Sequence, residues 1–143
     1  MSYLLDTNVL SETRKRRSAP GVAEWIAATP ADELYVSVLT LGEIEQGITR
    51  IGNRGDKKQA AALERWLREV EAGFAERIIP VTLRVAREWG RQHLEQPIPV
   101  IDALIAATAK VHGWIVVTRN GEDFERAGVR VLNPFVDVEG RPA

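Results

Sequence analysis

Short apolar segments of strand type alternate with longer segments of helical type along this chain, and the alternation limits its fold more than any other feature. The strand-type segments lie at residues 2–5, 34–38, 78–81, 114–118 and 129–132. The predicted helices lie at residues 20–29, 41–51, 56–76, 83–94 and 100–111, with a helical turn after residue 6 and a short helix ending at residue 127. Such alternation implies right-handed crossovers and a mainly parallel sheet covered on both faces. The sequence therefore predicts an α/β protein.

Length and composition indicate one ordinary globular domain. The chain has 143 residues, of which 45% are hydrophobic and 27% charged, enough for one sizeable core. We expect the domain to span residues 1–135 and residues 136–143 to form a short, weakly held tail. Neither a signal peptide nor an apolar run of the ~18 residues that a membrane span needs is present, so we expect a cytoplasmic protein without membrane contact. The net charge of −1 means that any polyanion must be held by a local patch or a bound metal.

Four acidic residues mark the ends of strand-type segments or the starts of helical ones: Asp6, Glu43, Asp102 and Asp123. The chain has no cysteine and two histidines, so the available donors are almost all oxygens. Oxygen donors suit Mg²⁺ or Mn²⁺, whereas zinc, copper and iron sites usually use imidazole and thiolate. Ligands of parallel sheets bind beyond the carboxyl ends of the strands, where Asp6 and Asp123 are expected. The pattern predicts a divalent-cation site for phosphate or phosphodiester chemistry.

Helix capping offers another interpretation for three of these acids. Asp6 suits an N-cap after the first strand. Glu43 follows Thr40 by three residues, the spacing of a capping box. Asp123 follows Asn120 by three residues, which suits an N-cap and an acid in the first helical turn. Taken singly, each of these three residues can be explained as part of a helix cap.

Asp102 is the exception, because it interrupts an otherwise apolar helix beside Ile101. A carboxylate in that setting is costly unless something pairs with it. A shared cation explains the common placement of the four acids better than independent caps do. Because carboxylates this close repel one another, we expect Mg²⁺ or Mn²⁺ to stabilise the protein.

Several short motifs occur in a fixed order from about residue 2 to residue 135. They are Leu4-Leu5-Asp6-Thr7-Asn8-Val9-Leu10, Ser37 with Leu41-Gly42-Glu43, Asp102-Ala103-Leu104-Ile105-Ala106-Ala107, Thr118-Arg119-Asn120 with Asp123-Phe124, and Asn133-Pro134-Phe135. Together they resemble the PIN-domain ribonucleases, in particular the VapC-type toxins of prokaryotic toxin–antitoxin pairs.

The resemblance implies a three-layer α/β/α PIN-like fold and an endoribonuclease that depends on Mg²⁺ or Mn²⁺. The four acids match the family's acidic positions without change. Small polar residues beside them would orient the carboxylates or water; they are Thr7, Asn8, Ser37, Thr118 and Asn120. The expected partners are an RNA substrate, a cognate antitoxin protein and a second copy of the chain in a homodimer.

The densest basic run is Arg14, Lys15, Arg16 and Arg17. It suits contact with RNA phosphates beside the acidic site, and it equally suits a solvated loop. His93 and His112, placed on predicted helices, are assigned to packing rather than to catalysis.

Other acidic-site proteins fit less well. A haloacid-dehalogenase phosphatase needs a second Asp where Asn8 stands, and a two-component receiver domain needs an acidic pair after the first strand and a lysine after the last core strand. The remaining alternatives are a PIN fold acting on DNA or structured nucleic acid, or a PIN module that binds nucleic acid without cutting it.

Overall fold

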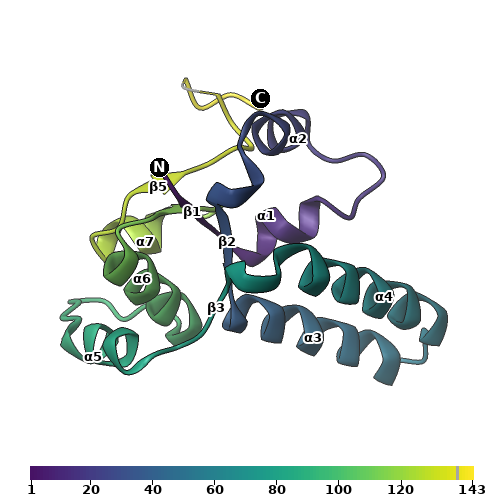
Figure 1. Cartoon of the computed structure of the whole chain (residues 1–143), viewed down its shortest axis with the longest axis horizontal. Helices are drawn as coiled ribbons and strands as arrows, with labels where there is room; N and C mark the ends of the chain where they lie inside the picture. Colours follow the sequence, from purple (N-terminus) through teal and green to yellow (C-terminus); the bar gives the residue numbers. More distant parts are fainter. Residues whose placement is uncertain (138) are drawn as a thin grey trace.

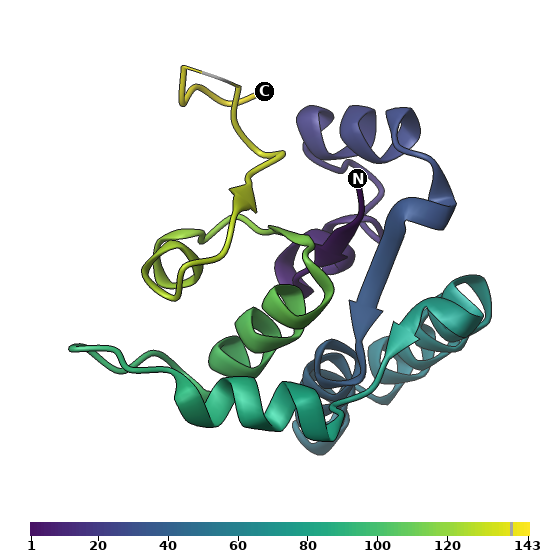
Figure 2. The same cartoon turned by 60° about the vertical axis from the view of Figure 1, so that its left-hand side comes forward.

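The computed structural model describes residues 1–137 and 139–143, and its centre is a five-stranded sheet (Figures 1 and 2). The strands are β1 (Tyr3–Leu5), β2 (Leu34–Ser37), β3 (Ile78–Ile79), β4 (Ile115–Val117) and β5 (Val131–Leu132). All neighbouring strands pair in parallel in the order β3-β2-β1-β4-β5. The predicted parallel α/β architecture is therefore confirmed. Of the predicted tail, Val138 lies outside the described residues.

The helices lie between the strands and after them. They are α1 (Thr7–Glu12), α2 (Pro20–Ala28), α3 (Val38–Asn53), α4 (Lys57–Phe74), α5 (Leu83–Arg91), α6 (Val100–His112) and α7 (Glu122–Arg126), with short 3₁₀ turns η1 (Ala31–Glu33) and η2 (Ala75–Arg77). Among the described residues, no helix combines the length and apolarity of a membrane span.

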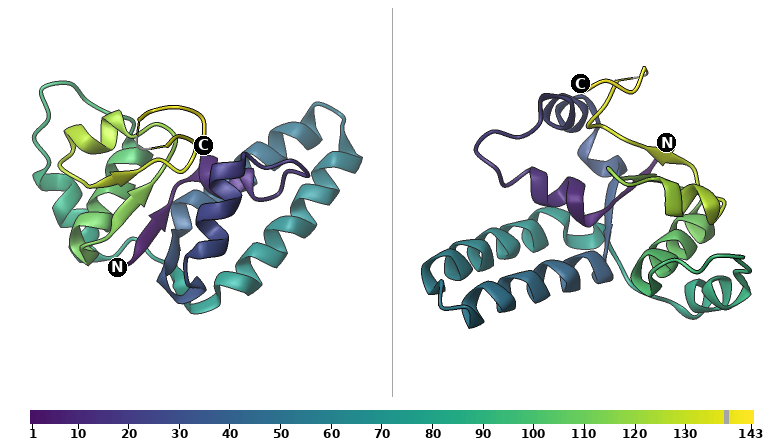
Figure 3. Two further views of the ribbon diagram at one scale, coloured as in Figure 1. Left: turned by 90° about the horizontal axis from the view of Figure 1, so that it is seen from above. Right: turned by 180° about the vertical axis from the view of Figure 1, so that it is seen from behind.

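Two apolar cores lie on opposite faces of the sheet, because successive strand side chains point to opposite sides. Leu5 and Val117 belong to the core formed with α1, α2, α3 and α4, whereas Leu4 and Val116 belong to the core formed with α6 and α7. Figure 3 shows α1–α4 on one side of the sheet and α5–α7 on the other. All four of these strand residues are at most 1% exposed. The result is the three-layer arrangement.

The strand order places β1 in the middle and makes it the point where the chain reverses direction across the sheet. The chain moves outward from β1 to β2 and β3, and then returns to β4 on the other side of β1. Ligands of open α/β sheets bind at such a switch point, outside the carboxyl ends of the strands. Asp6 directly follows β1 and Thr118 directly follows β4, so both lie at this point.

Element boundaries differ from the sequence prediction in two places that affect the site. Helix α3 begins at Val38 rather than Leu41, because the Ser37 hydroxyl oxygen accepts a hydrogen bond from the backbone N–H of Leu39 (3.0 Å) and caps the helix. Helix α5 ends at Arg91, so His93 lies in the connection to α6 and not on a helix.

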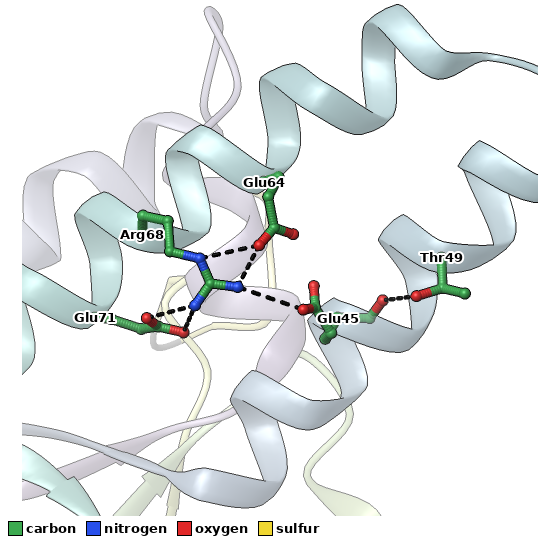
Figure 4. A network of polar contacts seen from close by, with 5 residues as sticks. All are labelled: Glu45, Thr49, Glu64, Arg68 and Glu71. Atoms are coloured by element: carbon green, nitrogen blue, oxygen red, sulfur yellow. Dashed lines mark hydrogen bonds and ion pairs between the residues drawn. The ribbon is translucent and has the colours of Figure 1, made fainter.

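Helices α3 and α4 form a hairpin that extends away from the sheet (Figure 1). On its exposed surface Arg68 contacts three glutamates, Glu45, Glu64 and Glu71 (Figure 4). The Arg68 Nη1–Glu71 Oε1 distance is 2.6 Å. This group joins the two helices through exposed side chains.

Candidate active site

Asp6 lies where β1 passes into α1, and its carboxylate is held from several directions. Its backbone N–H donates to the Val117 carbonyl (2.9 Å), which extends the β1–β4 pairing by one residue. Its Oδ1 accepts from the backbone N–H of Thr7 (2.9 Å), and its Oδ2 accepts from the Thr118 hydroxyl (2.8 Å). Burial raises the pKa of Asp6, and the two hydrogen bonds partly oppose that rise. Asp6 is thus both the N-cap of α1 and a buried acid at the switch point.

Thr118 and Asn8 tie the loop after β4 to Asp6. Besides donating to Asp6, the Thr118 hydroxyl accepts from Asn8 Nδ2 (3.2 Å) and from the backbone N–H of Asn120 (3.2 Å). Asn8 Nδ2 also lies 3.4 Å from Asp6 Oδ2, and Asn8 Oδ1 accepts from the backbone N–H of Arg119 (3.0 Å). Thr118 and Asn8 thus both contact the Asp6 carboxylate. Asn120 contributes its backbone and leaves its side chain exposed.

Glu43 lies on α3, with its Oε1 accepting a hydrogen bond from the Thr7 hydroxyl (2.6 Å). The alternative interpretation as a capping box with Thr40 is wrong. Ser37 is the N-cap, and Thr40 lies within the first turn with a fully buried hydroxyl that has no hydrogen-bond partner in the described part of the chain. Thr7 thus contacts the Glu43 carboxylate directly. Ser37 instead caps α3, the helix that carries Glu43.

Asp102 lies in the first turn of α6 and is half-buried. Its pKa is raised to about 6, first by burial and then by the negative charges of Asp6, Glu43 and Asp123. The charges of three acids that are far from Asp102 in sequence thus act on it in the folded protein.

Asp123 lies in the first turn of α7, after an N-cap at Gly121 rather than at Asn120. Its Oδ1 forms an ion pair with Arg126 Nη2 (2.5 Å). Arg126 also donates to Gln96 Oε1 (3.2 Å), so the guanidinium joins the fourth acid to the α5–α6 connection. The sequence analysis did not single out Arg126, although its position three residues after Asp123 on a helix is a signal for such a pair.

The acidic group has the chemistry of a site for a hard divalent cation. Its donors are carboxylate oxygens, which Mg²⁺ and Mn²⁺ prefer, and the raised pKa of Asp102 shows the repulsion that a cation relieves. Across residues 1–137 and 139–143, no three acidic, histidine or cysteine side chains are placed to hold a metal as they stand. Two of the acids are already engaged, Glu43 with Thr7 and Asp123 with Arg126. Each of these contacts uses one carboxylate oxygen, Glu43 Oε1 and Asp123 Oδ1.

The basic run follows α1, and its members have different surroundings. Arg14 lines a cavity of about 210 Å³ together with Thr7 and Glu43, which places it beside the acidic group. Lys15 Nζ instead forms an ion pair with the buried Glu12 (2.8 Å). Arg16 and Arg17 are exposed. Only Arg14 is thus brought to the site directly.

Arg119 was also missed by the sequence analysis. Its guanidinium lies over the Phe135 ring, 3.9 Å from the ring centre, and its carbonyl accepts from Asn133 Nδ2 (3.1 Å). Asn133 Oδ1 in turn accepts from the backbone N–H of Phe135 (2.9 Å). The Asn133-Pro134-Phe135 motif therefore supports the loop that carries Thr118. The Phe135 ring also holds the positively charged Arg119 side chain beside that loop.

Comparison with known proteins places the chain among proteins of this architecture. Residues 3–129 match the PIN domain family. The chain is 33% identical to "VapC ribonuclease Y4jK" of Sinorhizobium fredii over 137 residues, which cover 92% of this chain and 96% of that protein. It is 34% identical to "Toxin FitB" of Neisseria gonorrhoeae over 140 residues, which cover 94% and 99% of the two chains.

Solved structures agree with the sequence relatives. The crystal structure of FitAcB from Neisseria gonorrhoeae matches with a TM-score of 0.84 at 32% identity, covering 92% of this chain and 97% of the other. A toxin-antitoxin complex from Klebsiella pneumoniae matches with a TM-score of 0.64 at 27% identity, covering 94% and 98%. The similarity extends over nearly the whole of each chain.

Proposed function

Because this chain belongs to the PIN-domain family, with VapC-type relatives over nearly its full length, we propose that it is the ribonuclease toxin of a toxin–antitoxin pair. We further propose that it cuts RNA phosphodiester bonds with the help of Mg²⁺ or Mn²⁺. The observation that supports the metal most directly is the pKa of Asp102, raised to about 6 by burial and by three neighbouring carboxylates.

In the proposed site, Asp6, Glu43, Asp102 and Asp123 hold the cation. When bound, the cation lowers the pKa of a water molecule, orients it toward the scissile phosphorus and neutralises charge on the departing oxygen.

The chain's own residues position these acids. Thr118 and Asn8 fix the direction of the Asp6 carboxylate, since both donate to its Oδ2. Thr7 holds Glu43 against the start of α1. The hydroxyl and amide groups thus limit the rotation of two acids before any cation or RNA arrives.

We propose RNA rather than DNA as substrate because a relative of 33% identity carries the name ribonuclease. Arg14 and the exposed Arg16 and Arg17 give a basic edge for its phosphates. Such an edge is required because the chain as a whole has a net charge of −1.

A cognate antitoxin is the second proposed partner. The cavity that contains Thr7, Arg14 and Glu43 is also lined by Ser11 and by apolar residues of α3 and α4, including Ile48 and Trp66. An antitoxin segment with an apolar face would fill it and cover one of the acids. Trp66→Ala should weaken binding of the antitoxin without reducing RNA cleavage.

A homodimer is supported by apolar side chains left exposed at helix starts. Val38, Leu83 and Val100 are 40%, 67% and 59% exposed. Burying such side chains against a second copy is favourable. Sedimentation equilibrium of the purified chain tests this, and a monomer at all concentrations would contradict it.

The central experiment incubates a labelled mixed RNA pool and a matched DNA pool with the purified protein, in Mg²⁺, in Mn²⁺ and in EDTA, alongside Asp6→Asn. We expect metal-dependent cutting of RNA alone, lost in the variant, whose circular dichroism should match the wild type. Cutting in EDTA would contradict the metal site, full activity of Asp6→Asn would contradict the assignment of that residue, and binding of RNA without cutting would favour a non-catalytic module.

A further inference from the structure

A separate cavity of about 310 Å³ lies beside the acidic group, between the α5–α6 connection and α7. It is lined by His93, Leu94, Glu95, Gln96 and Arg126. In Figure 2 this connection is the teal-green segment at the far lower left, on the same side of the sheet as α7. The proposed metal site uses none of these side chains as a ligand.

Arg126 links this cavity to the acidic group. One nitrogen of its guanidinium contacts Asp123 Oδ1, and another donates to Gln96 Oε1 (3.2 Å). The charge of Asp123 in turn contributes to the raised pKa of Asp102. Arg126 is therefore part of the cavity wall and also contacts Asp123 of the acidic group.

The connection is held at both ends while its middle residues face solvent. At its start, Gln92 Nε2 donates to the Ala103 carbonyl in the first turns of α6 (2.9 Å). Near its end, Ile98 is 8% exposed and packs in the core on this face of the sheet. His93 and Gln96, between these anchors, are exposed. The segment thus presents polar side chains from a fixed backbone.

Three of the five lining residues, His93, Gln96 and Arg126, are of the types that recognise single-stranded RNA, and the other two are Leu94 and Glu95. Unpaired bases stack on His rings and Arg guanidinium planes and form hydrogen bonds along their edges. The Gln96 amide offers both donors and an acceptor, and the Arg126 fork matches the geometry of a phosphate. The volume lies at the lower end of the roughly 300–1,000 Å³ typical of small-molecule sites, which suits one nucleotide rather than a longer stretch.

We propose that the cavity between the α5–α6 connection and α7 binds the nucleotide next to the scissile phosphate, with Gln96 and His93 contacting its base and Arg126 its phosphate. This inference rests on the proposed ribonuclease function and adds the position that sets base preference. Arg126 then has two roles, because the same guanidinium contacts Asp123 and the substrate.

The test sequences the ends of RNA fragments produced from a randomised pool by the wild type, Gln96→Ala and His93→Ala. Gln59→Ala is the matched control, since Gln59 is an exposed glutamine on α4, away from the site. We expect Gln96→Ala to weaken the preference at one position beside the cut by about two- to tenfold, the effect of one hydrogen bond, with the change falling on KM more than on kcat. Gln59→Ala should give the wild-type profile.

A binding measurement separates failure of this inference from failure of the nuclease proposal. Fluorescence anisotropy with a labelled single-stranded RNA compares Asp102→Asn with Asp102→Asn/Gln96→Ala, neither of which needs to cut. Weaker binding of the double variant supports the subsite even if the wild type proves inactive. Unchanged binding together with an unchanged cleavage profile in Gln96→Ala and His93→Ala would overturn it.

Discussion

Two groups of carboxylates in this molecule bring negative charges close together, and the two groups differ in how the repulsion is offset. On the α3–α4 hairpin, Glu45, Glu64 and Glu71 surround Arg68 in solvent (Figure 4). Hydrogen bonding to Arg68 lowers the pKa of Glu64. At the carboxyl edge of the sheet, burial and mutual repulsion raise the pKa of Asp102 to about 6.

The difference lies in what supplies the positive charge. The hairpin group has an arginine of the chain at its centre. In the acidic site, Arg126 reaches Asp123 only, and Asp6 and Asp102 have no ion-pair partner within the described residues. Buried like charges without a counter-charge destabilise the folded protein. An external cation can relieve this repulsion. A surface network stabilises the fold slightly, whereas the repulsion in the acidic group is what the proposed cation would relieve.

The largest effect that distinguishes the two groups is expected from Asp102→Asn. Removing a carboxylate that we propose holds the cation should lower kcat/KM for RNA cleavage by roughly a hundredfold or more, since a bound metal contributes several kcal/mol of charge stabilisation. In EDTA the same variant should melt at a higher temperature than the wild type, because the neutral amide removes the repulsion. Differential scanning fluorimetry and initial rates measure both quantities. Glu45→Gln, in the exposed group, is the control and should cleave normally.

Thr118→Val should have the next largest effect. The substitution keeps the shape but removes the hydroxyl that donates to Asp6 Oδ2 at 2.8 Å. Losing a group that orients a metal ligand typically costs roughly ten- to hundredfold in metal affinity or activity. Titration of Mn²⁺ against cleavage rate measures the loss. Thr49→Val is the matched control, because the Thr49 hydroxyl bonds only to the Glu45 carbonyl on exposed α3; equal effects of the two variants would contradict the role of Thr118.

The pH dependence of stability gives a smaller, signed test. Asp102 binds its proton more tightly in the folded protein, with a pKa of about 6 against an ordinary 3.8. Its contribution to the free energy of unfolding is therefore fully present below the lower value and is lost as pH rises through the higher one. Urea unfolding in EDTA should show this loss in the wild type and less of it in Asp102→Asn. Identical pH profiles would show that Asp102 does not titrate as inferred.

Arg68→Met should have the smallest effect. Exposed ion pairs contribute little and are screened by salt. We expect a slight loss of stability that shrinks further at high salt, with RNA cleavage unchanged. A marked loss of cleavage would show that the hairpin network is coupled to the site, contrary to the separation of the two groups.

The sequence by itself determined the secondary-structure elements and the types of donor available to the proposed site. Strand and helix type follow from local apolar periodicity, so the predicted segments agree with the structure within a few residues. The four acids were identified because each stands beside a strand end or a helix start. The oxygen-donor set follows directly from the lack of cysteine and the two histidines.

Only the tertiary structure decided which side chains meet Glu43 and Asp6. Thr7 reaches Glu43 across 36 residues and Thr118 reaches Asp6 across 112. Such contacts depend on β1 lying between β2 and β4, which no local pattern specifies. The capping-box interpretation of Glu43 was wrong because Ser37, rather than Thr40, caps α3.

The cavity beside Asp123 was likewise decided by the fold. The helical spacing of residues 83–94 extended past Arg91, where the chain in fact leaves the helix. Gln92 is instead bonded to α6, and Gln96 meets Arg126 from 30 residues away. Long-range hydrogen bonds and packing overrode the local helical preference there, and they placed exposed polar side chains next to the acids.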